Sequence, residues 1–284
     1  MALSEQHTDD ADDTDSAGNP LHSAAMRNAV YEFLLFGLKQ ARACIFAGSF
    51  FGVLILSKTL PLGSLPRYDF ILIAALVLQA ALLASRVESL SEAVVLGLFH
   101  FIGLMLELFK THPAIHSWSY PEFGYTKLGT VPLYSGFMYA AVASYMCQSW
   151  RILDLELKHY PSYRLSVPLC VAIYANFFTN AFVRDVRLVL IPLVFVFFWR
   201  TQVYFTVWKV RRRMPLVLSF FLIGFFIWVA ENIATFFGAW VYPEQTARWT
   251  AVSTQKMSSW FLLVIISFVI VADLKHWRER RQTE

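Results

Sequence analysis

Residues 214–244 read MPLVLSFFLIGFFIWVAENIATFFGAWVYPE, and this stretch decides the class of fold. Between Pro215 and Gly238 it carries one charged side chain, Glu231, and it is long enough for a helix that crosses the hydrocarbon core of a bilayer. The whole chain of 284 residues is 57% apolar and 15% charged, which leaves too little polar surface for a water-soluble fold. We therefore expect an all-α protein, a polytopic bundle of membrane helices.

Apolar runs of similar length recur along the chain and predict about eight transmembrane helices. Their approximate ranges are 41–60, 69–85, 90–109, 131–150, 165–183, 188–208, 214–238 and 257–273. Arg200 interrupts the sixth run, and residues 31–40 before the first run are expected to lie at the membrane interface. The helices together form one transmembrane domain over residues 27–277.

The distribution of charge predicts the orientation of this domain. Residues 1–26 hold acids but no Lys or Arg and have little to bury, so we expect a disordered acidic leader. Basic clusters at residues 209–213 and 275–281 fall on the same side of the predicted bundle as both termini. The positive-inside rule therefore predicts that both termini are cytoplasmic, with residues 278–284 forming a basic tail.

One short pattern occurs twice in the predicted loops. Residues 118–122 read WSYPE and residues 240–244 read WVYPE, and each string follows an apolar run that contains an acid, Glu107 or Glu231. We interpret this recurrence as two tandem four-helix repeats over residues 30–150 and 160–277. The two acids would then face each other across a pseudo-twofold axis, and the functional site is expected there.

Glu107 and Glu231 are the acids that the sequence places inside membrane spans. A carboxylate in hydrocarbon costs several kcal/mol, so it is kept only where it is paired, protonated or used. Glu107 could form an ion pair with Lys110 one helical turn away, and Glu231 could join two helices by a hydrogen bond. Alternatively, each acid is a catalytic residue that donates a proton to an apolar substrate.

The residues expected to surround such a ligand share a position near these acids or in the repeated loops. They are His100, Lys110, Trp118, Tyr120, Trp228, Asn232, Trp240, Tyr242 and Trp260. Aromatic faces can stabilise a cation where water is excluded, although Trp and Tyr also serve as simple membrane-interface anchors. Both readings remain open.

Several other kinds of site are not expected. His112 and His116 have the spacing of a helical metal pair, but Pro113 between them indicates a loop, so we predict no metal site. The chain has no phosphate-binding loop, dinucleotide fingerprint or nucleophile elbow, and we predict no cofactor. A nucleic-acid partner is not expected, whereas the lipid bilayer is.

Two groups of motifs resemble a known family. The first comprises Glu107–Thr111, Trp118–Glu122 and Val131–Ala140, and the second comprises Trp228–Ile233, Trp240–Pro243 and Ser259–Trp260. Together, over about residues 30–274, they resemble the bacterial membrane proteins catalogued as domain of unknown function 817. This resemblance implies a multi-pass protein of the bacterial inner membrane and implies no activity.

A weaker resemblance rests on Glu107, the aromatic loop that follows it, and the stretch Gly129–Leu133 before the next helix. This order is similar to that of the membrane-bound carotenoid hydratases and heterodimeric-type lycopene cyclases, and it implies an isoprenoid ligand. We therefore expect a protein that binds or transforms an apolar lipid or isoprenoid in a cavity lined by acids and aromatic rings. A transporter of small molecules or ions and a non-catalytic membrane scaffold are the alternatives.

Overall fold

The computed structural model describes residues 20–283, with the side chains of residues 26–273 and of Lys275. The helices are α1 (Pro20–Ala43), α2 (Ile45–Thr59), α3 (Arg67–Ala84), α4 (Leu90–Lys110), α5 (Ser135–Ile152), α6 (Tyr163–Thr179), α7 (Arg187–Phe198), α8 (Leu216–Phe236), the 3-10 turn η1 (Pro243–Gln245) and α9 (Gln255–Thr283). The strands are β1 (Lys127–Leu128), β2 (Val131–Pro132), β3 (Glu156–Lys158), β4 (Gln202–Thr206) and β5 (Arg211–Pro215). Residues 1–19 of the predicted leader lie outside the described residues, as do the side chains of the predicted tail, and α1 already begins at Pro20.

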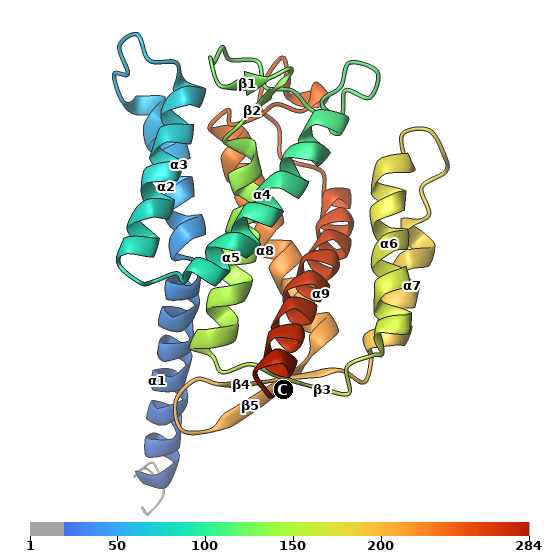
Figure 1. Cartoon of the computed structure of the whole chain (residues 1–284). Helices are drawn as coiled ribbons and strands as arrows, with labels where there is room; N and C mark the ends of the chain where they lie inside the picture. Colours follow the sequence, from blue (N-terminus) through green and yellow to red (C-terminus); the bar gives the residue numbers. More distant parts are fainter. Residues whose placement is uncertain (1–19, 284) are drawn as a thin grey trace, which may run out of the picture.

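The helices form a bundle with two distinct ends (Figure 1). Helix α5 lies inside the bundle and packs against α1, α2, α4 and α9. Helices α2 and α3 pair on one flank, and α6 and α7 pair on the other. One end carries the β1–β2 hairpin and the long loops after α4 and α8, which we call the loop end. The other carries the β3–β4–β5 sheet and the C-terminal part of α9, which we call the hairpin end.

Within the part of the chain that the structure describes, four helices are long and apolar enough to cross a membrane: α3, α4, α8 and the Gln255–Asp273 part of α9. A fifth span is counted if α1 and α2, which are bent by 66° at their junction, form one broken span. The prediction of about eight spans was therefore wrong. The run 131–150 became α5, a helix whose buried polar residues Ser144, Gln148 and Ser149 lower its hydropathy.

The predicted spans over residues 165–183 and 188–208 also failed, because the helices there are short. Helix α6 has 17 residues and α7 has 12, fewer than the roughly 20 that a membrane-crossing helix needs. After α7 the chain turns at Arg200 and continues as β4, which pairs antiparallel with both β3 and β5. The all-α prediction is corrected accordingly: the described part of the chain contains two small antiparallel sheets.

The predicted pair of four-helix repeats is not supported by the architecture. The β4–β5 hairpin separates α7 from α8, whereas a short turn joins the corresponding helices α3 and α4. The lengths of those helices differ too, since α3 has 18 residues and α7 has 12. What recurs is local: a long helix with a buried acid, an aromatic loop, and a further long helix.

Arg67 joins three segments at the loop end. Its guanidinium is 8% exposed, and its Nε donates to the Ser57 Oγ of α2 at 2.9 Å. Its Nη1 donates to Glu122 Oε1 in the loop after α4 and to the carbonyl oxygen of Gly238 after α8, both at 2.9 Å. The planar guanidinium suits this arrangement because it offers several donors in fixed directions. A single side chain thus holds α2 and α3 against both long loops.

Replacing Arg67 with Met should destabilise the fold, because the substitution strands several buried acceptors at once. We expect a loss of roughly 3–5 kcal/mol, the usual cost of breaking a buried ionic contact, seen as a lower midpoint of thermal unfolding in detergent. Arg248→Met, at an exposed arginine, is the matched control and should leave the midpoint nearly unchanged. Equal midpoints for the two variants would contradict the role assigned to Arg67.

Candidate functional site

Glu107 lies one turn before the end of α4 and is 2% exposed. Its Oε2 accepts hydrogen bonds from Trp118 Nε1 at 2.7 Å and from the Tyr120 hydroxyl at 2.8 Å. Its Oε1 accepts one from the Tyr139 hydroxyl of α5 at 2.9 Å. Burial raises the pKa of Tyr120 well above its ordinary value, so this loop hydroxyl keeps its proton and remains a donor at neutral pH. The acid therefore binds its own helix to the following loop and to the next long helix.

Glu231 is held in a similar way within α8, where it is 3% exposed. Its Oε1 accepts a hydrogen bond of 2.5 Å from the Tyr242 hydroxyl, and its Oε2 accepts one of 2.8 Å from Trp260 Nε1 on α9. Burial also raises the pKa of Tyr242 well above its ordinary value. In both units the donors include a tyrosine from the loop and an aromatic side chain from the helix that follows, and Glu107 also accepts from Trp118 of its loop.

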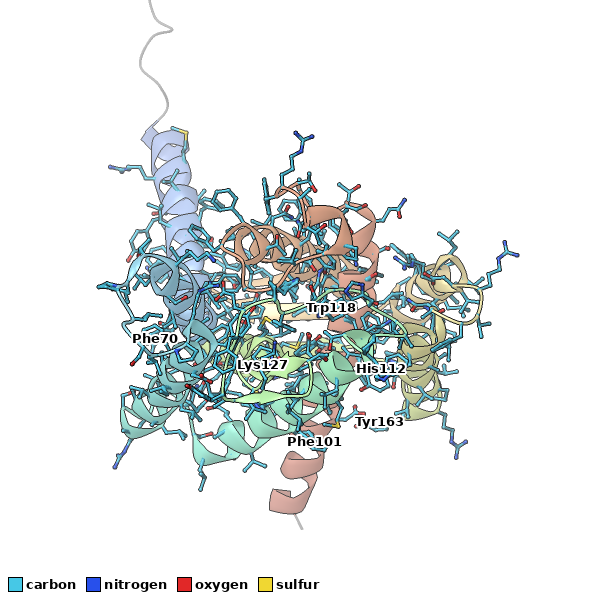
Figure 2. The ribbon with its side chains drawn as sticks, turned by 90° about the horizontal axis from the view of Figure 1, so that it is seen from above. Phe70, Phe101, His112, Trp118, Lys127 and Tyr163 are labelled. Atoms are coloured by element: carbon cyan, nitrogen blue, oxygen red, sulfur yellow. The ribbon has the colours of Figure 1, made fainter. Side chains whose placement is uncertain are left out.

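The two long loops pair with each other. Ser119 and Val241 exchange backbone hydrogen bonds of 2.9 Å in both directions, as two residues of an antiparallel ladder do. The rings of Trp118 and Tyr242 pack edge to face with their centroids 6.1 Å apart. Figure 2, which looks onto the loop end, places Trp118 near the middle of the bundle. The repeated strings thus meet over its centre and bring the two acid-centred units together.

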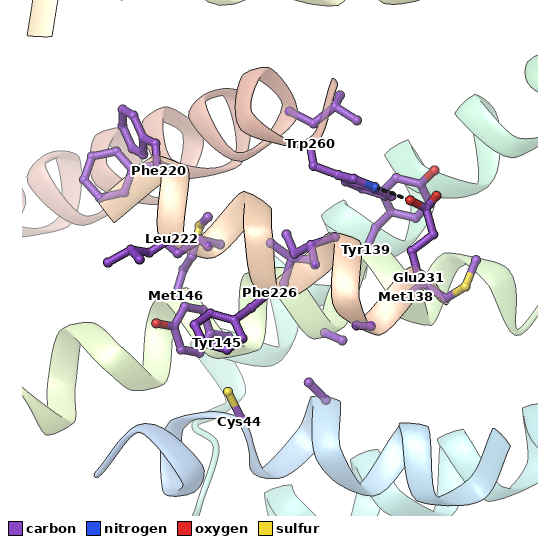
Figure 3. Close-up of a pocket in the computed structure, with 18 of the residues that line it drawn as sticks. Cys44, Met138, Tyr139, Tyr145, Met146, Phe220, Leu222, Phe226, Glu231 and Trp260 are labelled. Carbon is purple, nitrogen blue, oxygen red and sulfur yellow. Dashed lines mark hydrogen bonds between the residues drawn. The ribbon is translucent and has the colours of Figure 1, made fainter. Parts of the chain in front are cut away.

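A cavity of about 1090 Å³ lies beneath the paired loops and is lined mainly by apolar side chains of α1, α2, α5, α8 and α9. Glu107 and Glu231 both line it. Figure 3 shows Glu231 with Trp260 at one place in the cavity and Tyr145, Met146 and Phe226 along its wall. Phe33 and Phe226 line the cavity yet are 74% and 66% exposed, so it opens sideways between α1 and α8.

The structure brings together most of the predicted site residues. In addition to the two acids, the cavity is lined by Lys110, Trp118, Trp240, Tyr242 and Trp260. Tyr120 lies behind this wall, where it bonds Glu107. The predicted ion pair between Glu107 and Lys110 did not form: Lys110 Nζ donates instead to Asn180 Oδ1 at 3.0 Å.

Three predicted ligand-binding residues lie away from the cavity. His100 packs its ring against Phe137 with the centroids 4.6 Å apart. Trp228 Nε1 donates to the carbonyl oxygen of Val252, and Asn232 Oδ1 accepts from the backbone N–H of the same residue. These two side chains therefore fix the segment that leads into α9.

The predicted set of site residues omits three residues of the site. Tyr139, the third donor to Glu107, lies in the predicted span 131–150 and in a stretch that carries the family resemblance. Lys256 lines the cavity with its Nζ 4.2 Å from the centre of the Tyr242 ring, and Arg187 lines it from the start of α7. Lys256 lies shortly after the WVYPE string in the sequence, and this proximity was a usable signal for a place near the second aromatic loop. Arg187 had a weaker signal, because it follows the polar side chains at the end of the run 165–183, a pattern that could line a cavity.

Within the described residues, no group of three or more His, Cys, Asp or Glu side chains has the arrangement of a metal site. The site instead contains two carboxylates surrounded by Trp and Tyr donors, next to basic side chains and a large, mainly apolar cavity.

Comparison with known proteins gives the family. The model of a family described as "Protein of unknown function (DUF817)" matches residues 32–268. The chain belongs to this family. A DUF817 relative, the uncharacterized protein YoaT of Bacillus subtilis (strain 168), is 53% identical over 256 residues, which cover 90% of this chain and 96% of YoaT. No solved structure matches. The comparisons do not show the weaker resemblance to carotenoid hydratases and lycopene cyclases.

The numbers of donors predict different costs for removing the two acids. Glu107→Leu leaves three buried or partly buried donors without an acceptor and Glu231→Leu leaves two, at up to roughly 1–3 kcal/mol for each stranded group. Both variants should unfold at lower temperature than the wild type, with Glu107→Leu the less stable. Thermal unfolding in detergent measures this, with the exposed acid variant Glu244→Leu as control. A smaller loss for Glu107→Leu than for Glu231→Leu would contradict the donor count.

Proposed function

We propose that this DUF817 protein is an integral membrane protein that binds an apolar lipid or isoprenoid in the central cavity. The observation that carries the proposal is the cavity itself, which has a volume of about 1090 Å³, a mainly apolar wall and a sideways opening. Ligand pockets of roughly 300–1,000 Å³ are typical of small-molecule sites. A mainly apolar wall offers few polar atoms that could coordinate an ion, which favours a lipid ligand over the ion-transport alternative.

The hydrogen bonding of the two carboxylates favours a ligand-binding role for the cavity over a catalytic one. Every oxygen of Glu107 and Glu231 already accepts a hydrogen bond from a Trp or Tyr side chain. An acid that transfers a proton needs an oxygen directed at its substrate. We therefore assign the two acids the role of positioning the aromatic rings of Trp118, Tyr242 and Trp260 along the cavity.

We further propose that the cavity lies between two copies of one small unit, each consisting of an acid on a helix, an aromatic loop and the following helix. Support comes from the WSYPE and WVYPE strings and from the backbone pairing of Ser119 with Val241, which occupy the same position in the two strings. A ligand at this junction would contact equivalent aromatic residues from both units.

A neutral isoprenoid probe tests the binding proposal. All-trans-retinol should bind the purified protein in lipid nanodiscs and quench its tryptophan fluorescence, because Trp118, Trp240 and Trp260 line the cavity. Gly48→Phe should weaken binding at least about tenfold, because Gly48 lines the cavity and the added ring would occupy space that the ligand needs. A Cβ added at Gly48 meets no atom within 4 Å, so the backbone tolerates the substitution. A tenfold change corresponds to about 1.4 kcal/mol.

The matched control is Gly97→Phe. Gly97 also lies in an apolar helix with open space around an added Cβ, but it does not line the cavity. This variant should bind retinol as the wild type does. Saturable quenching that is equal in all three proteins, or absent from the wild type, would overturn the proposal.

We also propose that the hairpin end faces the cytoplasm of a bacterial inner membrane, with both termini on that side. Support comes from Lys209 and Arg211–Arg213, which lie at that end together with the C-terminal part of α9 (Figure 1). Glu32 on α1 pairs with Arg212 at 2.5 Å, which holds α1 to the same end.

Cysteine labelling tests this orientation. A membrane-impermeant thiol reagent added to intact cells should label Tyr125→Cys, whose native residue is 78% exposed at the loop end. The same reagent should label Lys209→Cys only after the inner membrane is made permeable. Labelling of the unsubstituted protein measures the background signal from its native cysteines. The reverse pattern of labelling would show that the orientation is inverted.

A further inference from the structure

Three basic side chains line the cavity near the loop end: Lys110, Arg187 and Lys256. Lys110 is the last residue of α4, Arg187 is the first residue of α7, and Lys256 is the second residue of α9. Helices from distant parts of the sequence therefore direct positive charge at one part of a cavity whose remaining wall is mainly apolar. Glu107 and Glu231 do not explain why three positive charges line this part of the cavity.

Lys110 is 4% exposed and has no acidic partner among the described residues that lies within salt-bridge distance. Its ammonium group donates to Asn180 Oδ1 and lies 4.6 Å from the centre of the Phe177 ring. A neutral amide and a ring face compensate a buried charge only in part, and buried charges in proteins are usually paired.

Lys256 is in a comparable position. Its ammonium group lies over the face of the Tyr242 ring, and no carboxylate in the described part of the chain reaches salt-bridge distance from it. The nearby Glu231 uses its two oxygens to accept from Tyr242 and Trp260. Glu244 adds a second negative charge, which acts only at longer range. The lysine thus has two acids nearby but no close ion pair.

Arg187 already has an acidic partner within the protein and is not available to pair with a ligand. Asp185 accepts from its Nε at 2.6 Å and pairs with its Nη2 at 2.5 Å, and Ser258 and Ser259 accept from its Nη1 at 3.2 and 3.1 Å. Although burial opposes it, hydrogen bonding to Arg187 lowers the pKa of Asp185 and keeps this acid ionised. Helices α7 and α9 also begin here, and the positive ends of their dipoles add to the positive charge of the three bases.

We infer that the cavity takes an amphiphile with an acidic head group, a carboxylate or a phosphate, bound by Lys110 and Lys256 while its apolar tail fills the cavity. This inference rests on the proposed lipid-binding function. An anionic head group would supply the negative charge that both lysines lack within hydrogen-bonding distance, and charge-assisted hydrogen bonds are about twice as strong as neutral ones. A neutral lipid would leave both ammonium groups without an anionic partner at hydrogen-bonding distance.

Two probes with the same hydrocarbon part and different head groups test the inference. All-trans-retinoic acid carries a carboxylate where all-trans-retinol carries a hydroxyl. In nanodiscs, the wild type should bind the acid about tenfold or more tightly than the alcohol. In Lys110→Met and in Lys256→Met this ratio should fall below about threefold, because the affinity for retinoic acid falls. Lys209→Met removes one charge at the distant, exposed hairpin end and should keep the ratio of the wild type.

The outcomes separate this inference from the proposal beneath it. Failure of both retinoids to bind would overturn lipid binding itself. Equal binding of both by the wild type, or a preference for the acid that survives both lysine substitutions, would overturn only the head-group site. Thermal unfolding of each variant shows that it is folded under the assay conditions.

A competition arm distinguishes a lipid head group from a small free anion. Inorganic phosphate at millimolar concentration should leave retinoic acid bound, because the tail supplies most of the binding energy of an amphiphile. Displacement of retinoic acid by phosphate, with retinol still bound, would assign the lysines to a free anion and overturn the amphiphile.

Discussion

A carboxylate inside an apolar helix is stable only where hydrogen-bond donors reach it, and this requirement organises the loop end of the protein. Glu107 and Glu231 lie near the ends of long apolar helices, and each receives a tyrosine hydroxyl from the loop that follows. Each also receives a donor from the next helix, Tyr139 on α5 or Trp260 on α9. Satisfying one acid therefore fixes three consecutive segments and folds the loop back over the bundle.

The two acid-centred units are then joined to each other. Backbone bonds between Ser119 and Val241 connect the loops, and Arg67 connects α3 to both of them. Because the loops are fixed from three directions, their aromatic side chains form one end of the cavity instead of extending into water. The cavity wall is consequently set by interactions that are mostly outside it, which explains how a large apolar space persists beside a polar cluster.

The sequence was sufficient for the mostly helical and apolar character of the fold and for drawing attention to the two acids and the aromatic loops, because each depends on a single local property such as apolar length or an isolated charge. It was insufficient for the number of spans. An apolar run does not reveal where a helix stops, and residues 188–208 divide between α7 and β4 although they are apolar almost throughout. The convergence of Tyr139, Arg187 and Lys256 on one cavity depends on the rotation and packing of three helices, which no local pattern encodes.

The separation of Glu107 from Lys110 shows how this structure produces a site with both charges present. The two residues are one helical turn apart and have the spacing of an ion pair. However, the carboxylate accepts hydrogen bonds from three aromatic side chains, and the lysine donates to Asn180 instead. Neutral donors stabilise the carboxylate without consuming a positive charge. Lys110 and Lys256 are therefore not neutralised by a close ion pair, although acids lie within a short distance. A site in which acids and bases neutralised one another directly would have had no such lysines, and its apolar cavity could discriminate ligands only by shape.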